Sequence, residues 1–518
     1  MGEMKVHLLG VAGAGMAPLA GLLRQAGHDV SGSDVAFDPP MGPRLEAWGV
    51  RTLRGTDPSH LDGLDAKRDV VVVGNVCRRD HPLAVEAERR GLRRVSMPTA
   101  LRELVFRDRP VIAVSGTHGK TTTTAIVASI LGHAGLDPGY LIGGLPVDPI
   151  PPASEPSPFA LGRTTRALHL AGASANAGAA SALAPFVVEG DEYDSAFFEK
   201  VPKVWGYAPR AAILTSIEHD HVDIYPDPAS YRAAFAGLLE RLPSEAEGGL
   251  LIANAADAAV VELVTAVRPT CRVVYFAASD ASGRPFPSGS TYGEAPVWTA
   301  SEAGLLDDAR VQPFDLFVGP SSAGRFGLGI FGAHNVGNAL AAIALCVELF
   351  GLRVRDVAPR LASFRGVQRR QQRLVDGARS DRGAHLYDDF AHHPTAVEAT
   401  LQSLRHRHRG ARVIGVYEPR SATACRAMHQ QAYVEAFLPA DVIILAPLGR
   451  TTLAEKERLD LDLLAKELRA RGKKVELCED HAAVIDTVDL LAEKGDVVVA
   501  MSNGAFGGVT AKLVERLA

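Results

Sequence analysis

The sequence predicts an α/β protein of three domains. Its 518 residues are too many for one typical hydrophobic core. Strand and helix patterns alternate in both end segments, which is typical of doubly wound sheets, and between them a glycine loop follows a buried strand and opens a helix. We therefore expect a Rossmann-like domain at residues 1–107, a central P-loop ATPase-type domain with a mostly parallel sheet at residues 108–364, and a Rossmann-like domain at residues 365–518.

The composition favours a cytoplasmic protein with small-molecule partners. Hydrophobic residues make up 47% of the chain and charged residues 22%, and the net charge of -5 argues against a nucleic-acid partner. Five cysteines without a CxxC pair indicate neither a disulfide framework nor a zinc site. The start of the chain has no charged-then-apolar leader, and no apolar stretch is long enough to span a bilayer, so we expect no membrane association. We expect a monomer or a weak homodimer.

The first segment starts with a strand at Val6 and the glycine turn Gly10-Val-Ala-Gly-Ala-Gly-Met16, followed by a helix over residues 17–26. The order GxxGxG differs from the GxGxxG of nicotinamide-binding proteins. The turn therefore favours a nucleotide diphosphate, with Asp34 contacting a sugar or base edge. The alternative is a turn that only packs the helix. A later strand over residues 69–74 places Asn75 at its carboxyl end.

The central loop, Gly116-Thr-His-Gly-Lys-Thr121, lies between an apolar strand at residues 111–114 and a helix. Backbone amides and a helix N-terminus favour anions. We expect Lys120 on the β- and γ-phosphates of a nucleoside triphosphate and the Thr121 hydroxyl on Mg²⁺. The spacing GxxGK is shorter than the usual GxxxxGK, so an ordinary strand-to-helix turn is the alternative. The presence of two phosphate loops in one chain is most simply explained if the protein binds two nucleotides.

Two later strands of the central segment end in polar clusters, at Glu189 and at His221. Ligands gather at the carboxyl ends of parallel strands, so both side chains are expected to hold metal against the triphosphate. Taken alone, each cluster is better explained by solvated acidic residues and a helix cap at Asp223. Farther on, Asn335 and Asn338 open a helix. Their amides fit an adenine edge, or Asn335 caps the helix.

Two stretches rich in Pro, Ala, Ser and Gly, residues 145–185 and 278–296, are expected to be surface insertions without chemistry. The last segment begins with Arg369 and Arg370, which would close over the triphosphate or form an ordinary surface pair. The tandem His392-His393 is weak support for a metal, and a capping or ligand-orienting role suits at least one of the two.

Together these motifs resemble those of the ATP-dependent Mur ligases of peptidoglycan synthesis, over essentially the whole chain. The shared motifs are Gly10–Met16 with Ser33-Asp34, Gly116–Thr121, Glu189-Gly-Asp-Glu192, Asp220-His221-Val-Asp223, His334-Asn335-x-x-Asn338 and Asp388-Asp389-Phe-Ala-His392-His393-Pro394. The resemblance implies that ATP energy joins a carboxylate to an amine through an acyl phosphate, with Mg²⁺ as cofactor. With sites on three domains, closure should accompany binding.

Finer details resemble the family members that recycle murein peptides: Glu192-Tyr-Asp194, Tyr417–Ser421 and Met501–Gly508. They imply UDP-N-acetylmuramate and the murein tripeptide L-Ala-γ-D-Glu-meso-diaminopimelate as substrates. L-Alanine, the acceptor in de novo synthesis, is the alternative. Ser216 stands where the family usually has Asn, and the first glycine turn is closer to that of the L-alanine-adding members.

The resemblance also implies a role for individual residues. The catalytic set is Lys120, Glu189, His221 and Arg370, and the metal set is Thr121, Glu189 and His221. The ATP-binding set is Gly116, Thr117, His118, Gly119, Lys120, Thr121, Thr122, His334, Asn335, Asn338, Arg370 and Asp389. The UDP-sugar-binding set is Gly13, Ala14, Gly15, Met16, Ser33, Asp34 and Asn75. The peptide-binding set is Arg420, Ser421, His392 and Asn503.

Two other classes of protein compete with a ligase. A nicotinamide-dependent oxidoreductase is disfavoured by the order of the first glycine turn. A non-catalytic nucleotide sensor would have no need of Lys120, Glu189 and His221, and all three are present.

Overall fold

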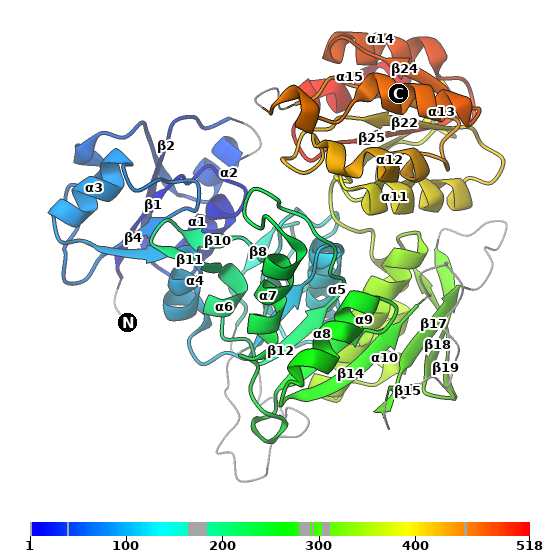
Figure 1. Ribbon diagram of the computed structural model, residues 1–518. Helices are drawn as coiled ribbons and strands as arrows, with labels where there is room; N and C mark the ends of the chain where they lie inside the picture. Colours follow the sequence, from blue (N-terminus) through cyan, green and yellow to red (C-terminus); the bar gives the residue numbers. More distant parts are fainter. Residues whose placement is uncertain are drawn as a thin grey trace.

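The computed structural model describes residues 3–38, 41–163, 184–278, 291–292, 295–302, 311–449 and 453–518. Three large sheets arise from successive parts of the chain, and Figure 1 shows the first and the last of them placed above the central one. Each is mostly parallel, so the predicted α/β class with three domains is confirmed. The boundaries after residues 107 and 364 stay a prediction.

The N-terminal sheet has five parallel strands in the order β3-β2-β1-β4-β5, as in a Rossmann-like domain. Strand β4 consists of four buried valines, the pattern of a parallel strand covered on both faces. The elements are β1 (Lys5–Leu9), α1 (Met16–Gln25), β2 (Asp29–Asp34), α2 (Met41–Ala47), β3 (Arg51–Arg54), η1 (Pro58–Leu61), β4 (Val70–Val73), α3 (Pro82–Arg89), β5 (Arg93–Ser96), α4 (Met97–Ala100) and η2 (Leu101–Phe106).

The central sheet has ten strands in the order β19-β18-β17-β14-β13-β12-β6-β9-β7-β8. It is parallel from β17 to β7 and antiparallel at its edges, where β18, β19 and β8 lie. The strands are β6 (Val111–Ser115), β7 (Gly139–Leu141), β8 (Phe159–Ala160), β9 (Phe186–Gly190), β12 (Ala211–Leu214), β13 (Leu250–Asn254), β14 (Arg272–Ala277), β17 (Trp298–Glu302), β18 (Gln312–Val318) and β19 (Ser321–Leu328).

Two small hairpins and several helices complete the central domain. The hairpins are β10 (Asp194–Ala196) with β11 (Glu199–Pro202) and β15 (Thr291–Tyr292) with β16 (Ala295–Pro296). The helices are α5 (Lys120–His133), α6 (Lys203–Gly206), α7 (Pro228–Leu239), η3 (Glu245–Glu247), α8 (Ala258–Val267), α9 (Ala333–Phe350), α10 (Val354–Val357) and η4 (Ala358–Ser363).

Helix α9 corrects one expectation from the sequence. It has 18 residues with a mean hydropathy of 1.4, so it is long and apolar enough to cross a membrane by these two criteria. However, 72% of it is buried inside the protein, where it packs against α5 and the strands β13, β14 and β17. Its apolar composition is explained by this position in the core, because a helix surrounded by protein is hydrophobic all round.

The C-terminal sheet has six strands in the order β20-β21-β25-β22-β23-β24, of which only the edge strand β20 is antiparallel. The strands are β20 (Gln372–Val375), β21 (His385–Asp389), β22 (Val413–Tyr417), β23 (Val442–Leu445), β24 (Lys474–Leu477) and β25 (Val497–Met501). The helices are α11 (Pro394–Arg407), η5 (Ala427–His429), α12 (Gln430–Ala436), η6 (Glu455–Glu457), α13 (Leu461–Ala470), α14 (His481–Leu491), η7 (Phe506–Gly508) and α15 (Val509–Leu517).

The central domain contacts its two neighbours in different ways. One continuous hydrophobic cluster includes both N-terminal and central residues. Within it, Phe159 of β8 contacts Trp48 edge to face with the ring centres 4.8 Å apart, and the tilted rings of Phe106 and Phe186 have their centres 4.9 Å apart. Apart from Val367, which packs in a cluster of the central domain, the C-terminal domain has separate clusters, and several of its contacts with the central domain are polar, such as the Arg365–Asp148 ion pair.

The two predicted insertions are described only in part. Residues 145–163 include β8, which pairs with β7, so this part of the first insertion belongs to the sheet edge. The remainder of the first insertion up to residue 183, and most of residues 278–296, lie outside the described residues.

Candidate active site

The predicted phosphate loop follows β6, between two strands that also end in polar residues. The register pairs Val114 of β6 with Glu189 of β9, and Ser115 with Leu214 of β12. The carboxyl ends of the three strands therefore meet at one edge of the sheet, as in other open parallel sheets that bind ligands. The loop, the acidic cluster after β9 and the Asp-His cluster after β12 all lie at this edge.

Gly116 and Gly119 are required by the backbone of the loop. Both have φ in the left-handed region, +130° and +83°. A Cβ atom at Gly116 would lie 2.2 Å from Thr215 Oγ1, and one at Gly119 would lie 2.5 Å from Asn338 Oδ1. Asn338 of α9 thus packs against the loop. Because Gly119 directly precedes α5, loop amides and the helix N-terminus are available to the same anion.

We expect Gly119→Ala to be more harmful than Gly135→Ala, which is its matched control. Gly135 also has a left-handed φ, +77°, but its Cβ position is open. Each alanine should cost about 1–2 kcal/mol through the backbone. Gly119→Ala should cost about 1–3 kcal/mol more by displacing Asn338, and should weaken ATP binding. Urea unfolding and calorimetry with a non-hydrolysable ATP analogue measure both effects, and equal losses in the two variants would contradict the expectation.

Ser216 fixes the shape of the loop from the neighbouring strand. The Thr117 amide donates to the Ser216 carbonyl at 3.0 Å, and the His118 amide donates to Ser216 Oγ at 3.1 Å. Thr117 Oγ1 also accepts from the Glu218 amide at 2.9 Å. The serine that replaces the usual Asn of the Mur ligases therefore keeps a polar contact with the loop.

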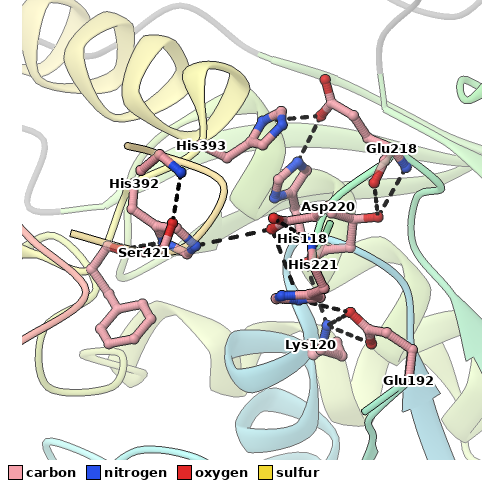
Figure 2. A network of polar contacts seen from close by, with 12 residues as sticks. His118, Lys120, Glu192, Glu218, Asp220, His221, His392, His393 and Ser421 are labelled. Atoms are coloured by element: carbon pink, nitrogen blue, oxygen red, sulfur yellow. Dashed lines mark hydrogen bonds and ion pairs between the residues drawn. The ribbon is translucent and has the colours of Figure 1, made fainter. Parts of the chain in front are cut away.

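Lys120 and His221 converge on the carboxylate of Glu192 (Figure 2). Lys120 Nζ lies 3.2 Å from Glu192 Oε2, and His221 Nε2 lies 3.2 Å from Glu192 Oε1. Lys120 also donates to the Gly116 carbonyl at 2.5 Å. The Glu192 side chain is only 1% exposed, so this is a buried network of charges.

The pKa values in this network keep the partners charged. Burial would raise the pKa of Glu192, but Lys120 and the hydrogen bond from His221 lower it to about 2. Burial would lower the pKa of His221, but Glu192 and Asp220 raise it above its usual value. Lys120 also has a raised pKa, since the nearby carboxylates outweigh its burial. His221 is thus biased toward the imidazolium, which must lose its proton before the ring can bind a metal.

A second cluster joins Thr121, Glu189 and Arg370. Thr121 Oγ1 donates to Glu189 Oε2 at 3.1 Å, and the Gly143 amide donates to Glu189 Oε1 at 2.5 Å. Arg370 Nη2 lies 3.4 Å from Thr121 Oγ1, so the C-terminal domain reaches the phosphate loop. Burial and Asp191 raise the pKa of Glu189.

Of the two predicted metal positions, the one formed by Thr121 and Glu189 fits a magnesium ion more closely than the one at His221. Thr121 and Glu189 supply adjacent oxygen atoms, which are the ligands that Mg²⁺ prefers. The raised pKa of Glu189 indicates a buried carboxylate with too little positive charge around it. His221, by contrast, contacts Glu192 and Asp220. The alternative that Asp223 caps a helix is wrong, because Asp227 caps α7.

The predicted adenine residues lie at the start of α9. Asn335 Nδ2 donates to the Phe331 carbonyl at 2.7 Å, and Asn338 Nδ2 donates to Asn335 Oδ1 at 3.2 Å. The residue at the N-cap position is Gly332, so the alternative that Asn335 caps this helix is wrong. Asp389 is held by two backbone amides, from Gln371 and Ala391, each at 2.7 Å. Both Asn residues and Asp389 still face the cavity described next.

A cavity of about 620 Å³ brings most of the predicted residues together from all three domains. Its volume is within the range of small-molecule sites. The predicted residues that line it are Ala14, Gly15, Asn75, Thr117, His118, Gly119, Lys120, Thr121, Thr122, Glu189, His221, His334, Asn335, Asn338, Arg370, Asp389 and His392.

Two residues predicted for the UDP-sugar are turned into the protein interior. Met16 is 6% exposed and packs in the hydrophobic core. Ser33 is 2% exposed, and its hydroxyl bonds to His7 Nε2 at 2.9 Å and His60 Nδ1 at 2.8 Å. Their side chains therefore support the turn from the inside, and their place in the UDP-sugar site stays a prediction.

Asp34 and Gly13 belong to the internal bonding of the first glycine turn. Asp34 accepts from the Ala12 amide at 2.9 Å and from the Val35 amide at 2.7 Å. The Gly13 amide donates to the Gly10 carbonyl at 3.2 Å, so this amide is already used within the turn. The parts of the turn that face the cavity are Ala14 and Gly15.

Three of the predicted peptide residues lie outside the cavity, on the C-terminal domain. Arg420 is exposed, and its side chain lies over Gly449 and Gly504, where a Cβ atom would be 2.9 Å and 2.3 Å from it. Within the described part of the chain, Arg420 forms no ion pair. Ser421 Oγ accepts from the Ala424 amide at 2.9 Å, and the buried Oδ1 of Asn503 has no hydrogen-bond partner.

The prediction of single site residues missed two carboxylates, Glu192 and Asp220. Glu192 holds Lys120 and His221, and Asp220, which is 4% exposed, lies 4.0 Å from His392 Nε2. Both belong to the motifs that the sequence analysis selected. Each motif contains two or more carboxylates, which could have pointed to these two residues. The prediction instead selected only the residue at the end of the strand.

Models of one protein family cover most of the chain. "Mur ligase family, catalytic domain" matches residues 5–109, "Mur ligase middle domain" matches residues 114–346, and "Mur ligase, glutamate ligase domain" matches residues 369–504. The chain belongs to the Mur ligase family. This Mur ligase is therefore an ATP-dependent, ADP-forming ligase. The oxidoreductase and sensor alternatives are set aside.

Two groups of relatives match this Mur ligase from end to end. The UDP-N-acetylmuramate–L-alanyl-γ-D-glutamyl-meso-2,6-diaminoheptandioate ligase of Escherichia coli is 32% identical over 99% of this chain and 98% of its own. The UDP-N-acetylmuramate–L-alanine ligase of Burkholderia pseudomallei is 33% identical over 98% and 97%. Among solved structures, a murein peptide ligase of Psychrobacter arcticus matches with a TM-score of 0.65 at 30% identity, over 99% of this chain and 98% of its own.

Proposed function

We propose that this Mur ligase joins the carboxylate of UDP-N-acetylmuramate to the amine of the tripeptide L-Ala-γ-D-Glu-meso-diaminopimelate, in peptidoglycan recycling. The observation that carries the proposal is the end-to-end match with the E. coli relative whose name states this ligation. A second relative of that name, from Haemophilus influenzae, is 30% identical over 99% of both chains. The solved murein peptide ligase structures give further support.

ATP would lie in the 620 Å³ cavity with its phosphates in the loop at residues 116–121. Lys120 stays protonated there and supplies positive charge to the β- and γ-phosphates. Thr121 and Glu189 would hold Mg²⁺, and His221 would hold a second ion after losing its proton. An ion bound at these ligands neutralises phosphate charge during transfer.

The chemistry proceeds in two displacements. A carboxylate oxygen of the muramyl group attacks the γ-phosphorus, the bond to the β-phosphate breaks, and ADP leaves an acyl phosphate behind. The amine then attacks the acyl carbon, loses a proton, and expels inorganic phosphate as the amide forms. Water would hydrolyse the acyl phosphate, so the C-terminal residues Arg370, Asp389 and His392 also matter because they close one side of the cavity.

The UDP-sugar would bind where the N-terminal domain meets the central domain. Ala14, Gly15 and Asn75 line the main cavity from the N-terminal side. Asn75 also lines a second cavity of about 590 Å³, together with Asp223 and Lys200 of the central domain. The muramyl carboxylate would thereby reach the phosphate loop while the uridine stays on the N-terminal domain.

Arg420 is the residue proposed to bind a carboxylate of the peptide. Its exposed guanidinium has no ion-pair partner among the described residues, and its side chain packs on Gly449 and Gly504, where any larger residue would collide with it. A planar guanidinium binds carboxylates through two parallel hydrogen bonds. The tripeptide carries several carboxylates and L-alanine one, so an open arginine outside the cavity favours the longer acceptor.

We expect the tripeptide to drive ADP formation faster than L-alanine when UDP-N-acetylmuramate and ATP are present. The measurement is a coupled phosphate-release assay in which both amines are compared at equal concentrations. The matched control omits UDP-N-acetylmuramate and should show no release with either amine. A higher kcat/KM for L-alanine would replace the proposal with its alternative, the L-alanine ligase, which the Burkholderia relatives support.

The remaining parts of the proposal concern the setting of the enzyme. We propose a cytoplasmic protein, a monomer or weak homodimer, with no nucleic-acid or membrane partner. The proposed domains are residues 1–107 for the UDP-sugar, 108–364 for ATP, and 365–518 for the amine substrate. Their limits agree with the parts of the chain from which the three sheets are built.

A further inference from the structure

A second cluster of ionisable side chains lies beside the phosphate loop. It consists of His118, Glu218 and His393, none of which is among the proposed magnesium ligands (Figure 2). His118 Nε2 lies 2.7 Å from Glu218 Oε2, and His393 Nδ1 lies 3.5 Å from the same oxygen. One nitrogen or oxygen atom from each of the three residues lies within 4.8 Å of the other two.

His393 is the most informative member of this cluster. It is 3% exposed, yet neither of its ring nitrogens has a hydrogen-bond partner among the residues that the structure describes. Buried polar groups are rarely left without a partner, so such a group needs an explanation. Burial lowers the pKa of His393 to about 3, so the ring is neutral at pH 7, and its Nδ1 lies 3.5 Å from Glu218 Oε2.

Glu218 supplies the negative charge. Burial would raise its pKa, but the hydrogen bond with His118 and the nearby histidine rings lower it to about 2. The cluster thus combines one carboxylate with the side chains of two histidines. Two His and one Glu form one of the known three-residue ligand sets for zinc.

We propose that His118, Glu218 and His393 bind a divalent transition-metal ion of the zinc type. Zinc ligands lie about 2.0–2.2 Å from the ion, so tetrahedral ligand atoms are about 3.4 Å apart. The observed separations from Glu218 Oε2 are 2.7 Å and 3.5 Å, and all three ligand atoms lie within 4.8 Å of one another, so side-chain rotations would bring them to this spacing. Imidazole suits zinc, copper, nickel and iron, whereas magnesium prefers oxygen, so this site differs in kind from that of Thr121 and Glu189.

The site joins three distant parts of the chain. His118 belongs to the phosphate loop, Glu218 follows β12, and His393 directly precedes α11 of the C-terminal domain. A candidate for a fourth ligand is His429, whose ring centre is 4.7 Å from that of His393 and whose Nε2 has no hydrogen-bond partner in the described parts of the chain. An ion bound here would therefore fix the C-terminal domain to the phosphate loop.

The competing explanation is that Glu218 only joins the two domains through hydrogen bonds. Thr395 Oγ1 donates to Glu218 Oε1 at 2.8 Å, and His118 occupies the other oxygen. That arrangement would connect the two domains without a metal. It leaves His393 unexplained, and it predicts no spectral signal from Co²⁺ that depends on residue 393.

The test uses the metal-free, full-length protein, titrated with Co²⁺ and then with Zn²⁺ in the absence of ATP and peptide. Four-coordinate Co²⁺ gives strong visible bands, which we expect to be lost in Glu218→Gln and kept in Glu189→Gln. In His393→Cys a thiolate would contact the ion, so a new near-ultraviolet charge-transfer band is expected. The matched control is His133→Cys. His133 is the last residue of α5, the helix that follows the phosphate loop, and lies roughly 20 Å from the end of the helix that adjoins the loop.

Retention of the visible bands in Glu218→Gln, or equal near-ultraviolet absorption in His393→Cys and His133→Cys, would overturn the proposal. Weak bands typical of six-coordinate Co²⁺ in the unmodified protein would overturn it as well. Circular dichroism confirms the fold of each variant, and the two independent substitutions guard against the failure of one to fold. Because no substrate is present, a negative result leaves the proposed ligase function intact.

Discussion

Lys120→Ala is expected to lower kcat by about 10³-fold or more. Lys120 is the lysine of the phosphate loop, and it lines the cavity that would hold the triphosphate. Its Nζ atom lies 3.2 Å from Glu192 Oε2, a contact that keeps the lysine charged. Phosphoryl transfer depends on positioning and on neutralising charge, and loss of one such cation typically removes about 10³–10⁵ of the rate. The measurement is steady-state phosphate release with UDP-N-acetylmuramate and the tripeptide.

Lys512→Ala is the matched control, because Lys512 is exposed on α15 and pairs only with Glu515 at the surface. It should leave kcat unchanged. Full-speed ligation by Lys120→Ala would contradict the whole mechanism. In the unmodified enzyme, oxygen-18 placed in the muramyl carboxylate should appear in the released phosphate, because the acyl phosphate breaks between carbon and that oxygen. Failure of the label to transfer would exclude the acyl phosphate.

Glu192→Gln is expected to lower the free energy of unfolding by about 3 kcal/mol at pH 7. The change leaves Lys120 and His221 without their shared counter-charge in a buried setting, and breaking a buried pair costs about 3–5 kcal/mol. The lowered pKa of Glu192 predicts a loss in the free energy of unfolding of similar size. A fall from 4.5 to about 2 on folding corresponds to about 3 kcal/mol.

The pH dependence gives this second prediction a direction. The folded-state pKa of Glu192 lies below the unfolded value, so its stabilisation is complete above pH 4.5 and disappears as the pH falls through about 2. The difference between Glu192→Gln and the unmodified protein should therefore shrink as the pH falls below 4.5. Urea unfolding followed by tryptophan fluorescence measures it. The exposed Glu479→Gln serves as the control, and a pH-independent difference would contradict the assignment.

The fold was predictable because its strongest signals are local. Runs of β-branched residues, such as Val70–Val73 and Val111–Val114, became buried parallel strands with nearly the expected limits. The phosphate loop was equally clear, since Gly116 and Gly119 occupy left-handed backbone positions that favour glycine. In both cases a few neighbouring residues determine the outcome.

The partners of the site residues were harder to predict because they depend on the path of the chain after each strand. Glu189 ends β9 and was chosen for that reason, but the turn that follows places Glu192 against Lys120 and His221. Ser33 shows that a position near a strand end does not determine where a side chain points. It lies beside a glycine turn, but its hydroxyl faces the interior, where it forms a hydrogen bond with His7 Nε2.

Contacts between distant segments were the hardest to predict, and the only signal for the cluster proposed above was the weak one of the tandem His392-His393. His118, Glu218 and His393 are separated by about a hundred residues or more along the chain, and only the packing of the C-terminal domain brings them together. The cysteine pattern indicated no zinc site, and the three ligands proposed here have no common motif. Helix α9 likewise needed the tertiary structure, because its composition alone does not distinguish a core helix from a membrane span.

The unequal contacts of the central domain have a consequence for product release. Separating the N-terminal domain would expose the shared apolar core to water, whereas the polar contacts of the C-terminal domain can be exchanged for contacts with water at small net cost. We therefore expect the N-terminal and central domains to stay together through many turnovers. The bulky muramyl peptide would leave when the C-terminal domain moves away from them.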